Sequence, residues 1–382
     1  MPIIPYGRQF IDEDDIRAVA DVLHSDWLTT GPKVVEFENA FADLVGAQYA
    51  VGITSGTAAL HSAMFALGIG PGDEVIVPSM TFAATANCVV FQGGRPVFAD
   101  VFPDTLLIDP DLIEEKITEN TKAVIAVDYA GQPCDYDKLK KITERHGLYL
   151  VADGCHALGA EYKGIVVGSL ADLTVFSFHP VKHITTGEGG MVTTDNQGFD
   201  HRLRIFRNHG IDTDARQREK AGSWYYEMIE LGYNYRLTDI QCALGISQLK
   251  KLPFFLKRRW EIAAFYDRAF ERINTITPLS VEDYGVHAYH LYVVKIDFAS
   301  LGMERSEFFR KTREMGVGIN VHYIPVHLHP YYRKNFGTGK GQCPVAEAAY
   351  EQIISLPMHP SMVKGDEEKV VQILNRTLQD RG

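Results

Sequence analysis

Paired cysteines, long apolar runs and an excess of basic residues are all missing from this sequence. The five cysteines are scattered over 382 residues, and no two form a Cys-x-x-Cys pair. This spacing disfavours a disulfide framework or a zinc site and fits free thiols in a reducing, cytoplasmic environment. Apolar runs such as residues 148–152 fall far short of the roughly 20 residues that a membrane helix needs. We therefore expect neither a membrane span nor an export leader.

The charge balance excludes a further class of partner. Acidic residues number 49 against 38 basic ones, which gives a formal net charge of -11 at pH 7. A chain of this sign repels nucleic acid at long range, and no segment has the basic character of a helix-turn-helix. We therefore expect no nucleic-acid partner, and an anionic ligand would need local Arg or Lys groups.

Apolar segments alternate with helical ones from residue 50 to 195, which is the pattern of an α/β fold. Residues 58–67 and 136–146 have helical character. Several of the apolar segments lack polar alternation, which is typical of strands buried on both faces. A mostly parallel central sheet covered by helices is therefore predicted. Its expected strands are residues 49–53, 74–77, 96–98, 123–127, 148–152, 173–178 and 191–194.

The second half of the chain has a different organisation. Residues 237–270 carry apolar side chains at helical spacing and predict a long helix that Pro253 interrupts. We expect a large domain over residues 1–250, with an N-terminal arm, and a small α+β domain over residues 251–382. The predicted elements of the small domain are a strand at 291–296, a helix at 305–315, a strand at 318–321 and terminal helices.

The densest chemical signal lies between Asp153 and Gly190. Asp153 follows the apolar run 148–152, so its carboxylate is expected at the carboxyl edge of the sheet, where open α/β folds bind ligands. Lys182 follows the strand 173–178 by four residues and places an amine at the same edge. Pyridoxal phosphate needs a lysine for its Schiff base and an acid to hold its ring nitrogen protonated. The pair therefore indicates this cofactor.

Pyridoxal phosphate also needs a cradle for its phosphate and contacts for its ring. Residues 54–57 read Thr-Ser-Gly-Thr between a predicted strand and a predicted helix, so backbone N–H groups and hydroxyls would face an anion. Ser177 adds a hydroxyl. Phe82 offers a ring that can stack on the pyridine, and His156 can hydrogen-bond the ring hydroxyl.

Each of these residues also has an ordinary structural reading. A lysine is commonly a surface residue, an Asp after a strand commonly caps a turn, and Ser55 would cap the next helix while it binds phosphate. Phe82 and His156 would both fit a buried core. The histidines of the chain lack a His-Glu-x-x-His pattern, so we expect no metal site.

Five motifs occur in a fixed order: TSGT at 54–57, DGCH at 153–156, FSFHPVK at 176–182, TTGEGG at 185–190 and GYNYRL at 232–237. In this combination the chain resembles the DegT/DnrJ/EryC1/StrS sugar aminotransferases, from about Tyr6 to the last helix. The resemblance implies an aspartate-aminotransferase-like, fold-type I pyridoxal phosphate enzyme. Some relatives carry His in place of the lysine and act as dehydratases, whereas Lys182 keeps the aminotransferase residue.

The resemblance implies a role for each motif residue. Lys182 would hold the cofactor as a Schiff base and then move a proton between the cofactor and C4 of the sugar. Asp153 would pair with the pyridinium nitrogen. The phosphate would be held by Gly56, Thr57 and Ser177.

The resemblance also implies contacts beyond the reacting groups. Phe82 and His156 would flank the cofactor ring. Asn234 would reach the cofactor phosphate of a neighbouring subunit, which implies a homodimer with shared active sites. The residues expected at the nucleotide sugar are Tyr6, Thr29 and Tyr323.

Within the family, residues 155–159, 176–182 and 321–326 most resemble the aminotransferases of pseudaminic-acid biosynthesis. The implied reaction moves an amino group from an amino acid, L-glutamate, to the C4 ketone of a nucleotide-linked 4-keto-6-deoxy sugar. In that pathway the sugar is UDP-2-acetamido-2,6-dideoxy-β-L-arabino-hexos-4-ulose. An alternative is a C4 or C3 aminotransferase of another UDP- or dTDP-keto-sugar. A pyridoxal phosphate-binding regulator and a nicotinamide-dependent oxidoreductase are further alternatives, although the Gly-x-Gly-x-x-Gly motif of the latter is missing.

Overall fold

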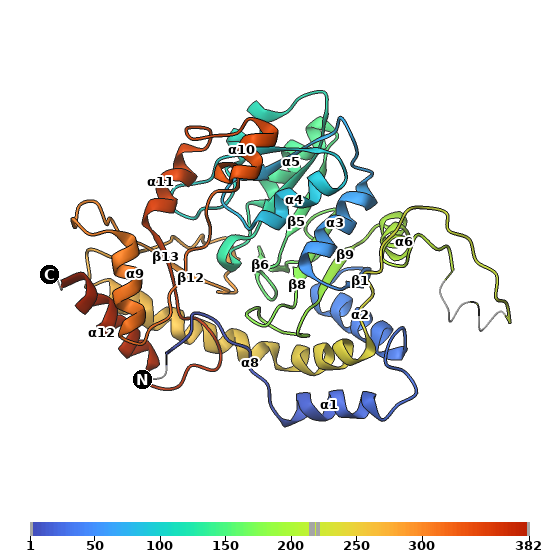
Figure 1. The fold of residues 1–382 in the computed structure, drawn as a ribbon, viewed down its shortest axis with the longest axis horizontal. Coiled ribbons are helices and arrows are strands. Elements are labelled where there is room, and N and C mark those ends of the chain that lie inside the picture. Colours follow the sequence, from blue (N-terminus) through green and yellow to red (C-terminus); the bar gives the residue numbers. More distant parts are fainter. Residues whose placement is uncertain (1–2, 214–217, 219–221, 380–382) are drawn as a thin grey trace.

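A seven-stranded sheet forms the centre of the chain (Figure 1). The computed structural model describes residues 3–213, 218 and 222–379. Within these residues only β9 runs against its neighbours, so the predicted mostly parallel α/β sheet is confirmed. In spatial order the strands are β1 (Tyr49–Ile53), β9 (Gly190–Thr194), β8 (Leu173–Ser177), β5 (Tyr149–Asp153), β4 (Thr121–Val127), β2 (Glu74–Pro78) and β3 (Arg95–Ala99).

Helices cover the sheet and connect its strands. The helices of this part are α2 (Pro32–Val45), α3 (Gly56–Leu67), α4 (Ala83–Phe91), α5 (Tyr136–His146) and α6 (Gln197–Phe206). Helix α3 is buried on nearly all sides, because it begins directly after β1 and packs across the sheet. The sheet and these helices enclose one continuous apolar core.

A buried carboxylate ties α2 to β1 and α6. Glu38 accepts the backbone N–H of Gly52 at 2.9 Å and pairs with Arg204 at 2.9 Å and with Arg207. Burial alone would raise the pKa of Glu38, but the two guanidinium groups hold it below its usual value. Because Arg207 also donates to the carbonyl of Gly52, this ion pair fixes the end of β1. The residues that follow β1 therefore start from a fixed position.

Two helices near the N-terminus were not expected from the sequence. Helix α1 (Glu13–Leu23) begins with a capping box between Asp12 and Asp15 and lies beside α8 (Figure 1). Helix α2 begins with Pro32 after Gly31. Both starts carry sequence signals that identify them, an Asp cap and a proline at the first helical position.

The expected interruption at Pro253 is wrong, because α8 (Asp239–Phe270) continues through it. A capping box between Thr238 and Gln241 starts this helix. Pro253 is exposed, whereas the adjacent Leu252 and the nearby Phe255 are buried. The missing N–H therefore lies on the solvent side, and the packed side of the helix keeps it continuous.

The last part of the chain has its own sheet and core. Its core joins the second half of α8 to α9 (Arg305–Glu314) and α12 (Asp366–Gln379). The antiparallel sheet consists of β10 (Thr277–Pro278), β12 (Tyr292–Lys295) and β13 (Ile353–Leu356). The strand expected at 318–321 is wrong, since that segment makes only isolated bridges. One bridge joins Val317 to Ile4 of the N-terminal arm, and another joins Asn320 to Ser355 of β13, so neither neighbour forms a continuous ladder with the segment.

Shorter elements complete the described chain. A small antiparallel sheet consists of β11 (Gly285–Val286), β6 (Glu161–Tyr162) and β7 (Ile165–Val166). The remaining helices are α10 (Pro330–Phe336), α11 (Pro344–Gln352) and the 3-10 turns η1 (Pro110–Leu112), η2 (Glu114–Lys116), η3 (Tyr129–Gly131) and η4 (Val326–Leu328). None of the helices in the described ranges is long and apolar enough to cross a membrane.

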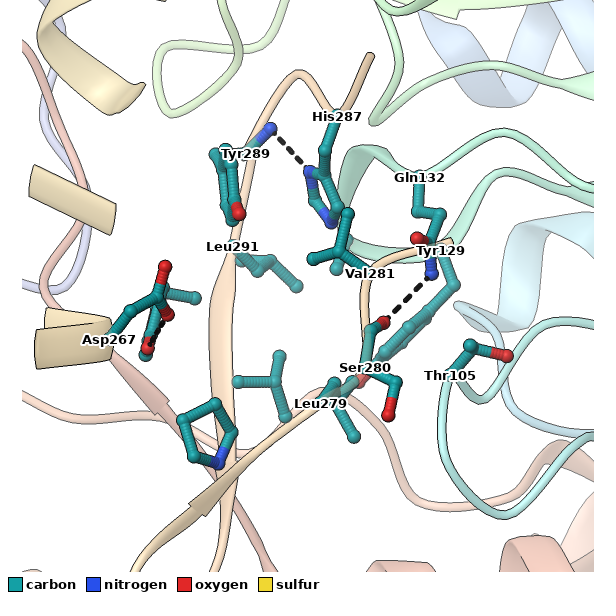
Figure 2. A pocket seen from close by; sticks show the side chains of 14 residues that line it. Thr105, Tyr129, Gln132, Asp267, Leu279, Ser280, Val281, His287, Tyr289 and Leu291 are labelled. Carbon is teal, nitrogen blue, oxygen red and sulfur yellow. Dashed lines mark hydrogen bonds between the residues drawn. The ribbon is translucent and has the colours of Figure 1, made fainter. Parts of the chain in front are cut away.

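Segments from both halves of the chain meet behind the sheet edge. A small cavity of about 20 Å³ lies there, lined by Tyr129 and Gln132 from one side and by Asp267, His287 and Tyr289 from the other (Figure 2). Helix α8 crosses residue 250, and α11 packs into the core of the large sheet. The division into residues 1–250 and 251–382 therefore stays a prediction.

Candidate active site

The carboxyl ends of β1, β5 and β8 converge on one edge of the sheet. Asp153 is the last residue of β5 and pairs with Val175 of β8. Across the next two strands, Ser177 pairs with Gly190, which pairs with Ile53. The strand register therefore brings Asp153, Ser177 and the residues after Ile53 to the same edge, as the sequence predicts.

The Asp153 carboxylate is buried, with 6% of the residue exposed. Thr85 in α4 donates its hydroxyl to Asp153 Oδ2 at 2.8 Å, and Thr81 donates in turn to Thr85 at 2.8 Å. The backbone N–H of Cys155 reaches Oδ1 at 3.3 Å. Two hydrogen bonds to its oxygens, one of them supported by Thr81, hold the carboxylate in place. Sequence reasoning missed Thr85, because nothing local marks a threonine 68 residues away as its partner.

Lys182 lies in the loop after β8 and is a partly buried residue. Burial lowers the pKa of this amine, although Asp153 opposes that shift. Its Nζ lies 3.4 Å from Nε2 of His290, a residue that the sequence did not single out. The arrangement favours a neutral amine, which can act as a nucleophile or take up a proton.

The start of α3 lies directly against Ser177. Ser55 caps the helix by accepting the N–H of Ala58 at 3.1 Å. A Cβ added to Gly56 would lie 2.9 Å from Cβ of Ser177 and 3.3 Å from Sγ of Cys155. Glycine therefore allows the start of α3 to lie close to Ser177, so that backbone N–H groups, the positive end of the helix dipole and the Ser177 hydroxyl can all face one phosphate. Ser55 therefore caps the helix, and its part in binding phosphate stays a prediction.

Aromatic side chains surround the space beside Asp153. Phe82 lies just before α4 with 58% of its surface exposed, and its ring is 5.8 Å from that of Tyr323. His156 is buried, and its Nε2 lies 3.0 Å from the hydroxyl of Tyr323. Burial lowers the pKa of His156 well below its usual value, so the ring is neutral. The Tyr6 ring lies 5.4 Å from that of His322, next to Tyr323 in the chain.

Two further predicted site residues lie on other segments of the chain. Thr29 pairs with Thr238 at the start of α8. Asn234 is exposed and pairs through its backbone with Asn208. Thr57, beside Gly56, is exposed at the first turn of α3. The other predicted residues, Tyr6 and Tyr323 included, lie at or beside the edge of the sheet.

These side chains fit pyridoxal phosphate. A buried carboxylate can hold a pyridinium nitrogen, and an exposed Phe82 ring can stack on the pyridine. The cradle at Gly56 would hold the phosphate, and Lys182 supplies the amine. Among the described residues, no three His, Cys, Asp or Glu side chains are grouped as metal ligands. The fold and this site define a fold-type I pyridoxal phosphate transferase.

Comparisons with known proteins give the same class. The family model described as "DegT/DnrJ/EryC1/StrS aminotransferase family" matches residues 9–375. The spore coat polysaccharide biosynthesis protein SpsC of Bacillus subtilis is 45% identical over 97% of this chain and 95% of its own. The putative sugar aminotransferase Spr1654 of Streptococcus pneumoniae, solved in its PMP form, is 36% identical with a TM-score of 0.93, over 98% of this chain and 99% of its own. Helicobacter pylori PseC, an aminotransferase of pseudaminic-acid biosynthesis, is 33% identical with a TM-score of 0.92 over 99% of both chains.

The chain belongs to the DegT/DnrJ/EryC1/StrS aminotransferase family. It is a sugar aminotransferase, and its cofactor is pyridoxal phosphate. The expected family, fold class and cofactor are thus confirmed.

The tight contact at Gly56 gives a first prediction. In Gly56→Ala the added methyl group would force Ser177 or the start of α3 to move, and such overpacking typically costs about 1–3 kcal/mol. We expect the affinity for pyridoxal phosphate, measured by equilibrium dialysis, to fall by about 10-fold. The matched control is Gly70→Ala, where an added Cβ meets nothing within 4 Å. Equal affinities for both variants and the wild type would show that Gly56 does not shape the cradle.

Proposed function

We propose that this chain moves an amino group from L-glutamate to the C4 ketone of a nucleotide-linked 4-keto-6-deoxy sugar. The observation that carries the proposal is the joint placement of a buried carboxylate, Asp153, and a half-buried amine, Lys182, beside the Gly56 cradle. Each of the two half-reactions needs one group that holds the cofactor and one that moves a proton. This pair supplies both.

The reacting groups divide the work as follows. Asp153 would hold the ring nitrogen of the bound cofactor, and Thr85 fixes the carboxylate. The bound cofactor supplies an electron-withdrawing ring that acidifies the carbon bearing the amino group. Lys182 would hold the cofactor between turnovers and would otherwise move the proton to and from the reacting carbon. Its depressed pKa supports this role, because a proton acceptor must be neutral at working pH.

The remaining predicted residues bind and orient. Phe82 would stack on one face of the ring, and His156 with Tyr323 would hold the ring hydroxyl side. The phosphate would be bound by Gly56, Thr57 and Ser177. Tyr6, Thr29 and Tyr323 are proposed to contact the nucleotide sugar. The 5.4 Å contact between the rings of Tyr6 and His322 supports a substrate contact by Tyr6, because it brings the N-terminal arm near the site.

Within this class we propose UDP-2-acetamido-2,6-dideoxy-β-L-arabino-hexos-4-ulose, the 4-keto sugar of pseudaminic-acid biosynthesis, as the substrate. Support comes from the likeness to PseC over 99% of both chains, together with the motifs at 176–182 and 321–326. The likeness to SpsC and Spr1654 keeps other UDP- or dTDP-keto-sugars as the second candidate.

Product analysis separates these candidates. We expect the wild type with L-glutamate to convert the UDP-linked 4-keto sugar into its 4-amino product, at least about 100-fold faster than a dTDP-linked 4-keto sugar. NMR of the product gives the position and stereochemistry of the new amine. Preference for the dTDP sugar, or an amine at C3, would overturn the pathway assignment while the sugar aminotransferase remains.

We further propose a homodimer in which Asn234 completes the partner's site. Between α6 and α8, residues 207–235 loop out from the rest of the chain in their described middle part (Figure 1). Both ends stay packed, because Arg207 pairs with Glu38 and the carbonyl of Tyr235 accepts the N–H of Thr54. This loop exposes large apolar side chains, with Trp224 at 84%, Leu231 at 76% and Met228 at 66%. Exposed apolar clusters of this kind mark interaction surfaces. Asn234 lies exposed at the base of this loop, so a partner that covers the loop would also reach Asn234.

Mixed subunits test this assembly. If Asn234 acts in the partner's site, Lys182→Ala and Asn234→Asp are each inactive alone, but a mixture reassembled at equal amounts regains about a quarter of the wild-type activity. Half of the dimers would then be mixed, and each mixed dimer has one intact site. In the control mixture, Lys182→Ala with Asp153→Asn, both changes lie in the subunit's own site, so no activity returns. A monomer in solution, or equal recovery in both mixtures, would contradict the proposal.

A further inference from the structure

His290 faces Lys182 from the segment that precedes β12. Its neighbours His287, Tyr289 and Leu291 line the cavity behind the sheet edge (Figure 2). His290 is not among the cavity-lining residues, and its Nε2 lies 3.4 Å from Nζ of Lys182. This short segment therefore lines the cavity with three of its residues and contacts the amine of Lys182 through His290.

A buried arginine fixes the backbone of His290. Arg259 in α8 is fully buried and donates Nη1 to the carbonyl oxygens of Tyr289, His290 and Met358, at 3.0, 3.2 and 2.9 Å. Three bonds from one guanidinium hold two chain segments against the helix. The position of the His290 ring thus depends on α8 and not on a free loop.

The surroundings of the ring keep it neutral. His290 is 5% exposed, and its ring centroid lies 4.4 Å from that of His156 and 5.8 Å from that of His183. Burial lowers the pKa of His290 well below its usual value, and the neighbouring Lys182, His156, His183 and Arg259 act in the same direction. Nδ1 has no hydrogen-bond partner among the described residues. A neutral imidazole with its proton on Nδ1 leaves Nε2 as an acceptor.

We propose that His290 is a positioning residue that accepts an N–H of Lys182 and so fixes the direction from which this amine moves a proton. Lysine has a long side chain with several rotatable bonds, and a single directed contact removes much of that freedom. A displacement of about 1 Å at a reacting group can cost on the order of 100-fold in rate. His290 acts through Lys182 and does not itself react.

Variants at one position separate positioning from packing. His290→Leu fills the position with an apolar side chain and removes the acceptor, whereas His290→Gln supplies an acceptor oxygen. The matched control, His287→Leu, removes another imidazole of the same segment, which is partly buried, accepts the N–H of Tyr289 and lines the cavity. We expect His290→Leu to lower kcat with L-glutamate by about 10- to 100-fold while KM stays within about 2-fold. His290→Gln should retain most of the activity.

A second readout needs neither substrate nor cofactor. The Lys182 amine of the full chain, stripped of pyridoxal phosphate, is labelled competitively with acetic anhydride across a pH range, and the peptide that contains it is quantified by mass spectrometry. A neutral acceptor stabilises the ammonium form more than the amine, so its loss should move the labelling midpoint of His290→Leu to lower pH. The midpoints of His290→Gln and His287→Leu should match that of the wild type.

Three results would overturn the proposal. One is an unchanged midpoint in His290→Leu, and another is an equal shift in His287→Leu. The third is a loss of kcat in His290→Gln as large as that in His290→Leu. Thermal unfolding of all variants shows which are folded. If His290→Leu does not fold, the kcat and the labelling midpoint of His290→Gln decide the test.

Discussion

A carboxylate buried at the carboxyl edge of a parallel sheet is the constraint on which this site depends. Asp153 is nine-tenths buried, and such a charge is costly unless hydrogen bonds and a cation compensate it. Thr85 and the N–H of Cys155 supply the hydrogen bonds. In our proposal the pyridinium of the bound cofactor would supply the compensating cation, so the buried carboxylate that is costly in the fold would favour cofactor binding.

The histidines around the Lys182 amine are uncharged, in contrast to the charged carboxylate of Asp153. Around Lys182 lie buried histidines, among them His156 and His290, all held neutral by burial and by each other. Neutral imidazoles can accept hydrogen bonds without adding a charge that would repel the cofactor's pyridinium. Arg259, the one fully buried arginine in the described chain, donates from Nη1 to backbone carbonyl oxygens and so holds the segment of His290 in place. The lysine can therefore act as a base within a rigid frame.

Local patterns predicted the centre of the fold and the positions of Asp153 and Lys182, because continuous apolar runs mark buried parallel strands and polar residues at their ends mark the edge. Partners far apart in the sequence could not be found in this way. Thr85 lies 68 residues from Asp153, and His290 lies 108 residues from Lys182. The break at Pro253 was wrong because tertiary packing outweighs one missing hydrogen bond on an exposed face.

The most direct test of the central claim, that Asp153 and Lys182 together hold pyridoxal phosphate for transamination, is an absorbance spectrum. Purified wild type and Lys182→Ala are each mixed with pyridoxal phosphate, and spectra are recorded before and after L-glutamate is added. The wild type should show a visible band from the lysine-bound cofactor that L-glutamate removes, and Lys182→Ala should form no such band. A wild type without the band, or a variant that forms it and responds equally to L-glutamate, would contradict the claim.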